Sequence, residues 1–200
     1  VHKIIGEAAD ELGQLDNLVR VEGVGCCGLG QFYVNHDATI AAHGRACAVA
    51  TGIKRSTPDS LVYTYQGDGD LASIGLAETM SAANRGENFT VIFVNNGIYG
   101  MTGGQMAPTT LIGMKATTAP GGRDPEVHGY PMHVVEILDQ LTAPYYLERV
   151  SCNTPQNVMK ARNAIKKGFQ YQLEGRGFSL IEIVTSCPTN WGLSTLDSLK

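Results

Sequence analysis

Two short polar segments follow hydrophobic stretches of this 200-residue sequence, and together they could hold a diphosphate through a metal ion. They are Gly67-Asp68-Gly69 and Asn95-Asn96, and 25 residues (70–94) lie between them. Because that interval fits one helix and one strand, Asp68 and Asn96 are expected at neighbouring strand ends. A carboxylate oxygen, an amide oxygen and backbone carbonyls form a hard oxygen set that suits Mg²⁺. The two segments therefore predict a magnesium–diphosphate site.

Alternating strands and helices must position these segments. Continuous apolar runs predict buried strands, and apolar residues at helical spacing predict helices. The alternation predicts an α/β fold, with a mostly parallel sheet covered by helices on both faces, in a single domain over residues 1–200. The expected strands are 18–22, 61–65, 90–94, 145–150 and 178–184, and the expected helices are 2–13, 46–56, 71–85, 133–141 and 155–173.

Glycine-rich loops follow several of these apolar runs. Glycine makes up 24 of the 200 residues, where roughly 7% is usual, which indicates backbone brought close to a ligand. Periodicity is lost from Gly97 to Met132, an interval too long for an ordinary connector. Loops of this length are usually functional or disordered.

The overall charge excludes some classes of partner. The chain has 15 Lys and Arg against 19 Asp and Glu, a net charge of −4, and no basic block. A nucleic-acid backbone and an anionic membrane surface are therefore not expected as partners. No apolar run approaches the roughly 20 residues that a bilayer span needs, so a soluble protein is expected.

The five cysteines are irregularly spaced, and none forms a Cys-x-x-Cys pair: Cys26, Cys27, Cys47, Cys152 and Cys187. This pattern does not predict a secreted disulfide framework or a self-contained metal site, and it favours the reducing cytoplasm. The first predicted helix begins at the start of the sequence without an N-cap. We therefore expect that further residues precede Val1.

The segment Gly23-Val24-Gly25-Cys26-Cys27-Gly28, with Asp37 further along the chain, also matches the spacing of a dinucleotide-binding fingerprint. That fingerprint requires a helix directly after the third glycine. Residues 29–40 have strand-like and turn residues without helical periodicity. A Rossmann site is therefore not predicted.

The ordered set of motifs resembles a known family. The spacing of Gly-Asp-Gly and Asn-Asn is similar to the thiamine diphosphate motif. The wider set resembles the β subunit of 2-oxoacid:ferredoxin oxidoreductases, most of all the 2-oxoglutarate and branched-chain (2-oxoisovalerate) members. The segments that carry this resemblance are Val24-Gly25-Cys26, His43-Gly44-Arg45, 65–70, 102–106 and 187–192, which span nearly the whole chain.

This resemblance implies roles for particular residues. Asp68, the Asn96 side chain and the carbonyl of Ile98 would ligate Mg²⁺, and Gly69, Gly100 and Thr102 would line the diphosphate. The loop with Gly25, Cys26 and Cys27 would hold the cofactor. His43 and Arg45 would lie near the cofactor or the substrate carboxylate, although either could instead form a structural hydrogen bond or a surface ion pair.

Family members also bind a [4Fe–4S] cluster through an N-terminal Cys-x-x-Cys and two cysteines that match Cys26 and Cys187. The Cys-x-x-Cys is missing from this sequence, and two thiolates cannot secure a cluster that normally needs four. We therefore expect no cluster on the chain as given. Cys27, Cys47 and Cys152 match no ligand position and are expected to be packing residues.

The implied reaction is the oxidative decarboxylation of a 2-oxoacid to an acyl-coenzyme A, with electrons passed singly to ferredoxin. Thiamine diphosphate does the chemistry, and in the family its activating glutamate belongs to another subunit. No glutamate here is placed for that role, since Glu78 is expected on a solvated helix face. The implied partners are a pyrimidine-binding α subunit and a ferredoxin-like subunit. A non-redox thiamine-dependent decarboxylase or synthase, or a scaffolding subunit that has lost the cofactor, remain as alternatives.

Overall fold

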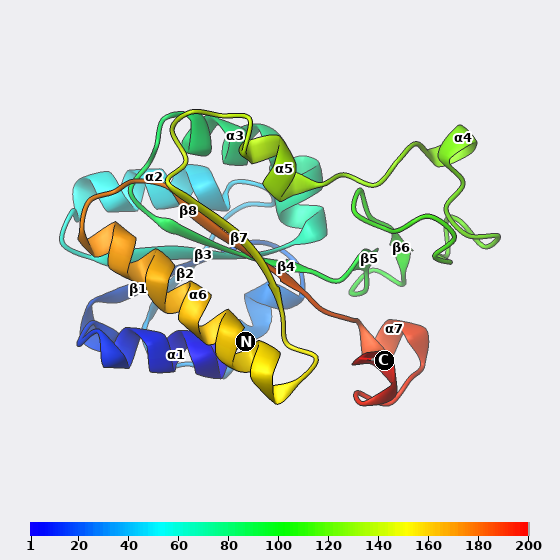
Figure 1. Ribbon diagram of the computed structural model, residues 1–200, viewed down its shortest axis with the longest axis horizontal. Coiled ribbons are helices and arrows are strands. Elements are labelled where there is room, and N and C mark those ends of the chain that lie inside the picture. The colour runs from blue at the N-terminus through cyan, green and yellow to red at the C-terminus, as the bar shows by residue number, and fades with distance from the viewer. Residues whose placement is uncertain (200) are drawn as a thin grey trace.

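The computed structural model describes residues 1–199 and is built around a sheet of six parallel strands (Figure 1). The strand order is β2-β1-β3-β4-β8-β7, and each neighbouring pair is parallel. The strands are β1 (Leu18–Glu22), β2 (Asp37–Ile40), β3 (Leu61–Gly67), β4 (Thr90–Asn95), β7 (Tyr146–Ser151) and β8 (Ser179–Val184). A two-stranded antiparallel ribbon, β5 (Ile98–Tyr99) with β6 (Gln105–Met106), follows β4. The predicted α/β fold is confirmed.

Helices cover both faces of the sheet, and each face has its own hydrophobic core. On one face, α1 (His2–Glu11) packs beside α6 (Pro155–Leu173). On the other lie α2 (Ala46–Ser56), α3 (Leu76–Asn84) and α5 (Val134–Leu138). The central strands β3 and β4 are buried over most of their length, which explains why their sequences are continuous apolar runs rather than alternating ones.

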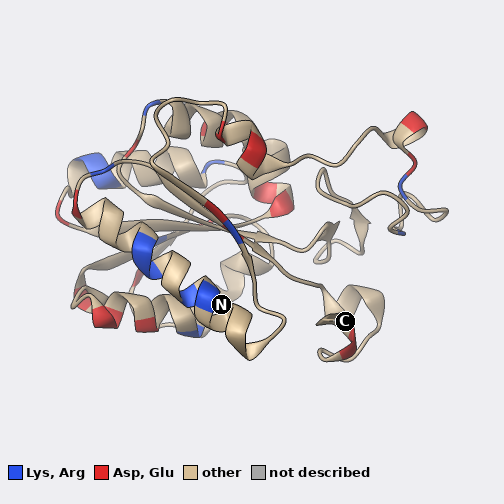
Figure 2. Cartoon of the chain, viewed as in Figure 1, with Lys and Arg blue, Asp and Glu red and all other residues tan. Residues whose placement is uncertain are grey.

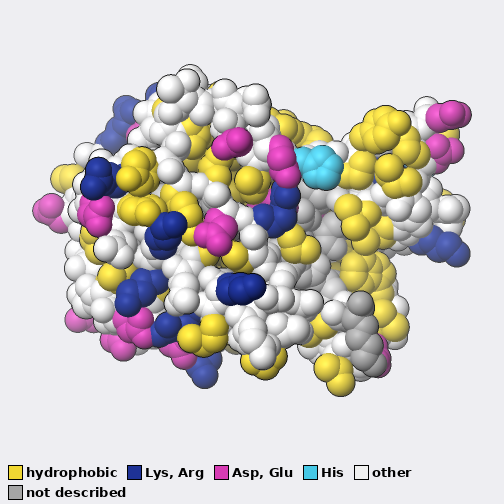
Figure 3. Space-filling view, viewed as in Figure 1, with side chains coloured by type: hydrophobic (Ala, Val, Ile, Leu, Met, Phe, Trp, Pro, Cys, Tyr) yellow, Lys and Arg dark blue, Asp and Glu magenta, His cyan; other side chains and the backbone are white. Residues whose placement is uncertain are grey.

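The loop between β6 and α5 extends away from the sheet and carries the short helix α4 (Pro125–His128) (Figure 1). Hydrophobic side chains gather on this extension in the space-filling view (Figure 3), and its exposed members include Leu111, Ile112, Val127 and Tyr130. Acidic and basic residues are interspersed along the helices, strands and loops of the fold (Figure 2). No helix of residues 1–199 is both long and apolar enough to cross a membrane.

Several elements differ from the sequence-based prediction. β2 was not predicted, because all four of its residues are exposed at the sheet edge and so lack an apolar run. A 3₁₀ helix, Cys26–Phe32, precedes it. The helix expected over residues 71–85 is a π-helix, Gly69–Ile74, followed by α3. The break falls at Gly75, where backbone packs directly on Gly44. The helix expected over 133–141 is shorter, and α7 (Pro188–Trp191) was not predicted.

Candidate cofactor-binding site

Asp68 and Asn96 lie side by side at the carboxyl edge of the sheet, as the sequence predicted. Asp68 directly follows β3 and Asn96 directly follows β4, and these strands are paired with Gly67 opposite Val94. Asp68 Oδ2 and Asn96 Oδ1 both accept a hydrogen bond from the Ile98 backbone N–H, each at 3.2 Å. A carboxylate oxygen and an amide oxygen therefore converge on one point.

The Asp68 carboxyl group is buried at this point, with 4% of the residue exposed. Burial raises its pKa to about 6, although hydrogen bonds from Gly69 N–H and the Thr109 hydroxyl act in the opposite direction. Among residues 1–199, no lysine or arginine forms an ion pair with it. A buried carboxylate without a cation is costly, and a divalent metal would remove that cost. The donor set thus fits Mg²⁺, which prefers oxygen ligands.

A cavity of about 390 Å³ opens beside these oxygens. Its walls come from α1 and from the loops that follow β1, β2, β3 and β4. Ten of the residues predicted to bind the cofactor line it: Gly25, Cys26, Cys27, His43, Asp68, Gly69, Asn96, Ile98, Gly100 and Thr102. The structure therefore brings together residues from four separate parts of the sequence.

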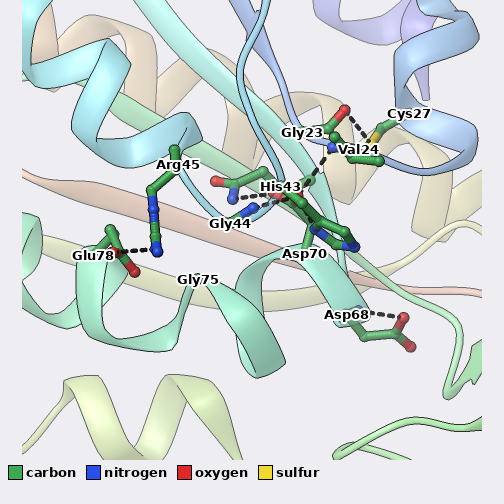
Figure 4. A network of polar contacts seen from close by, with 12 residues as sticks. Gly23, Val24, Cys27, His43, Gly44, Arg45, Asp68, Asp70, Gly75 and Glu78 are labelled. Carbon is green, nitrogen blue, oxygen red and sulfur yellow. Dashed lines mark hydrogen bonds and ion pairs between the residues drawn. The ribbon is translucent and has the colours of Figure 1, made fainter.

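Arg45 is the exception among the residues predicted to bind the cofactor. Its guanidinium does not line the cavity but forms an ion pair with the Glu78 carboxylate, on α3 (Figure 4). Glu78 is correspondingly half-buried rather than on a solvated face, with 22% of its side chain exposed. The structure thus shows the alternative given for Arg45, an ion pair with a carboxylate of the chain itself, and a place for Arg45 beside a ligand anion stays a prediction.

Asp70 was not among the predicted residues, yet it connects three of the loops around the cavity (Figure 4). Its Oδ1 accepts hydrogen bonds from Val24 N–H at 2.9 Å, Gly44 N–H at 2.8 Å and His43 Nδ1 at 2.7 Å. Its Oδ2 accepts from Gln66 Nε2 at 2.7 Å. The side chain is fully buried, so these four donors take the place of water.

This carboxylate decides which ring nitrogen of His43 donates a hydrogen bond to it. Ionised Asp70 can only accept a hydrogen bond, so the hydrogen lies on Nδ1 of His43, and Nε2 is left as the nitrogen available to a ligand. The His43 side chain is 45% exposed and lines the cavity. Close packing also holds the Asp70 backbone in place, since a Cβ at Gly75 would lie 2.4 Å from the Asp70 carbonyl oxygen. The repeated Gly-Asp pattern at 67–70 was the signal in the sequence that could have identified Asp70.

Further side chains support Asn95, the turn at Gly97 and Asp68. Asn95 Nδ2 donates to Glu182 Oε1 at 2.7 Å, and Glu182 Oε2 accepts from Arg149 Nε at 2.8 Å. The Gly97 carbonyl accepts from the Thr110 hydroxyl at 2.6 Å, and the Thr109 hydroxyl donates to Asp68 Oδ2 at 3.3 Å. These contacts join residues far apart in the sequence, and no local motif marked them.

The cysteines separate into two groups. Cys26 is exposed on the cavity wall, and a Cβ at Gly100 would lie 2.7 Å from Cys187 Sγ, so Cys187 packs against another wall residue. Cys27 is buried, and burial raises its pKa to about 11. Cys47 is buried and Cys152 is half-buried. In the described chain, no group of three or more His, Cys, Asp or Glu residues is arranged to hold a metal ion.

Comparison with known proteins agrees with this geometry. Residues 23–183 match the family model for the thiamine pyrophosphate enzyme, C-terminal TPP binding domain. The chain belongs to this thiamine pyrophosphate enzyme family. Thiamine pyrophosphate is the thiamine diphosphate of the sequence motif, and the matched range contains both strand ends of the site.

Relatives of this TPP-binding domain confirm the resemblance seen in the motifs. It is 53% identical, over 95% of its length, to the ketoisovalerate oxidoreductase subunit VorA of Methanothermobacter thermautotrophicus. It is 39% identical, over 93% of its length, to the 2-oxoglutarate synthase subunit KorB of Methanocaldococcus jannaschii. The alignments span 40% and 65% of those relatives.

A solved structure shows the same architecture. The 2-oxoglutarate:ferredoxin oxidoreductase from Magnetococcus marinus, with 2-oxoglutarate, coenzyme A and succinyl-CoA bound, superposes with a TM-score of 0.78 at 30% sequence identity. The match covers 98% of this chain and 64% of that one.

Proposed function

We propose that this chain is the thiamine diphosphate- and Mg²⁺-binding part of a 2-oxoacid:ferredoxin oxidoreductase. The observation that carries the proposal is the convergence of the Asp68 and Asn96 oxygens on one point beside the cavity. In this role Asp68, Asn96 and the Ile98 carbonyl ligate Mg²⁺, while Gly69, Gly100 and Thr102 line the diphosphate. Bound thiamine diphosphate would supply the chemistry that decarboxylates the 2-oxoacid.

The chain's own contribution is to bind and orient the cofactor and to exclude water from it. The cavity wall is largely apolar, with Val24, Ile74, Val94 and Met101 among its residues. Such a wall lowers the local dielectric and strengthens each polar contact made inside it. His43, held through Nδ1 by Asp70, lines the cavity and leaves Nε2 free for a polar contact there. The loop with Gly25 and Cys26 closes the cavity on the β1 side.

A branched-chain 2-oxoacid fits this wall better than 2-oxoglutarate does. No lysine or arginine of residues 1–199 lines the cavity, so this chain offers no fixed cation for a second substrate carboxylate. The relative of 53% identity is a ketoisovalerate oxidoreductase subunit. We therefore propose 2-oxoisovalerate as the preferred substrate, with coenzyme A as the acyl acceptor.

The activity requires partner subunits. None of the described cavity-lining residues is a glutamate, and the group that activates the cofactor would come from a pyrimidine-binding α subunit. A ferredoxin-like subunit and ferredoxin would receive the electrons. Cys26 and Cys187 would supply two thiolates of a [4Fe–4S] cluster only if two others come from a Cys-x-x-Cys outside residues 1–200. We propose that the complex works in the cytoplasm, where its free cysteines stay reduced.

The proposal is tested with the complex purified together with its associated subunits. Viologen reduction is measured with coenzyme A and each of 2-oxoisovalerate, 2-oxoglutarate and pyruvate. We expect the fastest reduction with 2-oxoisovalerate, and no reduction without coenzyme A or by the isolated chain. Release of carbon dioxide without viologen reduction would favour the non-redox decarboxylase. Failure to bind thiamine diphosphate in the presence of Mg²⁺ would favour the scaffolding subunit.

A further inference from the structure

Arg123 is a buried cation in the extended loop after β6, with 5% of the residue exposed. Its guanidinium donates to six backbone carbonyls and, among residues 1–199, forms no ion pair with a carboxylate. The carbonyls belong to Ala107, Pro108, Thr110, His128, Gly129 and Tyr130, at 2.7–3.4 Å. A buried charge must be compensated, and here carbonyl dipoles alone provide that compensation.

These bonds join two stretches of chain that otherwise have little regular structure. Nη1 bonds the carbonyls of residues 107, 108 and 110, whereas Nε and Nη2 bond those of residues 128–130. The Met132 N–H adds one bond to the Pro108 carbonyl, at 2.9 Å. Since the planar guanidinium presents five donors in fixed directions, it sets the backbone path of residues 107–110.

The backbone fixed in this way carries Thr109 and Thr110, which contact both sides of the metal site. The Thr109 hydroxyl donates to Asp68 Oδ2 at 3.3 Å. The Thr110 hydroxyl donates to the Gly97 carbonyl, between Asn96 and Ile98, at 2.6 Å. Both threonines are buried, so no water can take over their hydrogen bonds without rearrangement of the loop.

We propose that Arg123 is a positioning residue of the magnesium–diphosphate site, which acts through Thr109 and Thr110 on Asp68 and on the turn at Gly97. The proposal rests on the proposed function, because it assumes that Asp68 and Asn96 hold the metal. Arg123 itself does not line the cavity. Its effect is to hold the protein oxygens that ligate the metal in the correct orientation before the metal binds.

The test measures Mg²⁺ affinity in the purified complex rather than turnover. Thiamine diphosphate binding is followed by equilibrium dialysis as MgCl₂ is titrated, for the wild type, Arg123→Met, Arg123→Lys and Thr109→Val. Loss of a group that orients metal ligands typically weakens metal affinity about 10–100-fold. We expect Arg123→Met to raise the half-saturating Mg²⁺ concentration at least about tenfold, and Arg123→Lys to raise it less, since lysine keeps the charge and three donors.

Arg162→Gln is the matched control. Arg162 forms ion pairs with Glu7 and Glu11 between α6 and α1, on the face of the sheet that these helices cover, whereas the extended loop projects away from the sheet (Figure 1). Its loss should lower thermal stability but leave the half-saturating Mg²⁺ concentration within about twofold of the wild type. A general loss of stability is thereby separated from a specific effect on the site.

The double variant Arg123→Met/Thr109→Val identifies the route of the effect. If Arg123 acts through Thr109, its effect on Mg²⁺ affinity should shrink when the threonine hydroxyl is already absent. Unchanged Mg²⁺ affinity in Arg123→Met, or fully additive effects in the double variant, would overturn the proposal. Should Arg123→Met fail to fold, unchanged affinity in Thr109→Val would overturn it instead. A wild-type complex that binds no thiamine diphosphate would overturn the proposed function as well.

Discussion

Removal of the Asp70 carboxylate should destabilise the fold strongly, because Asp70→Ala leaves four donors without an acceptor. Two of them, the Gly44 N–H and Gln66 Nε2, are buried. A buried donor left unsatisfied costs about 1–3 kcal/mol, so these two alone cost about 2–6 kcal/mol. That is a large part of the roughly 5–15 kcal/mol by which a typical domain is stable.

Asp70→Asn serves as the graded comparison. The asparagine Oδ1 can still accept from Val24, His43 and Gly44, but its NH₂ group would face Gln66 Nε2, which is also a donor. One mismatched pair rather than several lost bonds should cost about 1–3 kcal/mol. The expected order of stability is therefore wild type, then Asp70→Asn, then Asp70→Ala.

Urea unfolding followed by far-ultraviolet circular dichroism gives the free energy of unfolding for each variant. Hydrogen exchange at the Val24 and Gly44 amides reports on the same loops locally, and both amides should exchange faster in Asp70→Ala. A free energy for Asp70→Ala within about 1 kcal/mol of the wild type, the lower limit for one lost buried bond, would refute the reasoning. Unchanged protection of both amides would refute it independently.

Three further changes have defined outcomes. Arg45→Gln should leave the affinity for thiamine diphosphate, measured by equilibrium dialysis, within about twofold of the wild type, because the exposed ion pair between Arg45 and Glu78 contributes only about 0–1 kcal/mol. A tenfold loss of affinity would show that Arg45 acts at the binding site. Gly75→Ala should lower stability by about 1–3 kcal/mol through overpacking, whereas Gly52→Ala, where the new methyl group meets no atom within 4 Å, should be neutral or stabilising in thermal unfolding. Burial is the main cause that lowers the pKa of His2 and of His36 from 6.5 to about 4. At each histidine the unfolded chain therefore binds more protons than the folded one between these values, which lowers stability by up to about 1.4 kcal/mol per pH unit as the pH drops from 6.5 to 4, less what solvent screening removes. The buried Asp68 carboxyl group, whose pKa is raised to about 6, acts in the opposite direction and offsets part of one histidine's contribution, so urea titrations should show a smaller net fall. Constant stability over that window would contradict the burial argument.

Much of the fold could be predicted from sequence because the buried strands are apolar runs. The segments at 61–65 and 90–94 predicted β3 and β4, and the polar residues after them predicted the juxtaposition of Asp68 and Asn96. This inference needed only strand direction and order along the chain. It did not require knowledge of any long-range side-chain contact.

The remainder depends on contacts that sequence spacing does not encode. Arg45 looked suited to an anion, but α3 places the Glu78 carboxylate against it. The role of Asp70 depends on hydrogen bonds from the loops after β1 and β2, which are distant in the sequence. The exposed edge strand β2 has no apolar signal, and Arg123 lay in an interval without any periodicity.

The cavity has walls from the loops after four different strands, together with α1. A partly folded chain in which any one of these segments is unfolded has an incomplete cavity. A ligand therefore binds only the fully folded chain. Binding then acts on folding by mass action. At a hundred times its dissociation constant, a ligand of this kind would stabilise the native state by about 2.7 kcal/mol. For the proposed ligand, thiamine diphosphate, a higher free concentration would thereby raise the fraction of this chain that is folded.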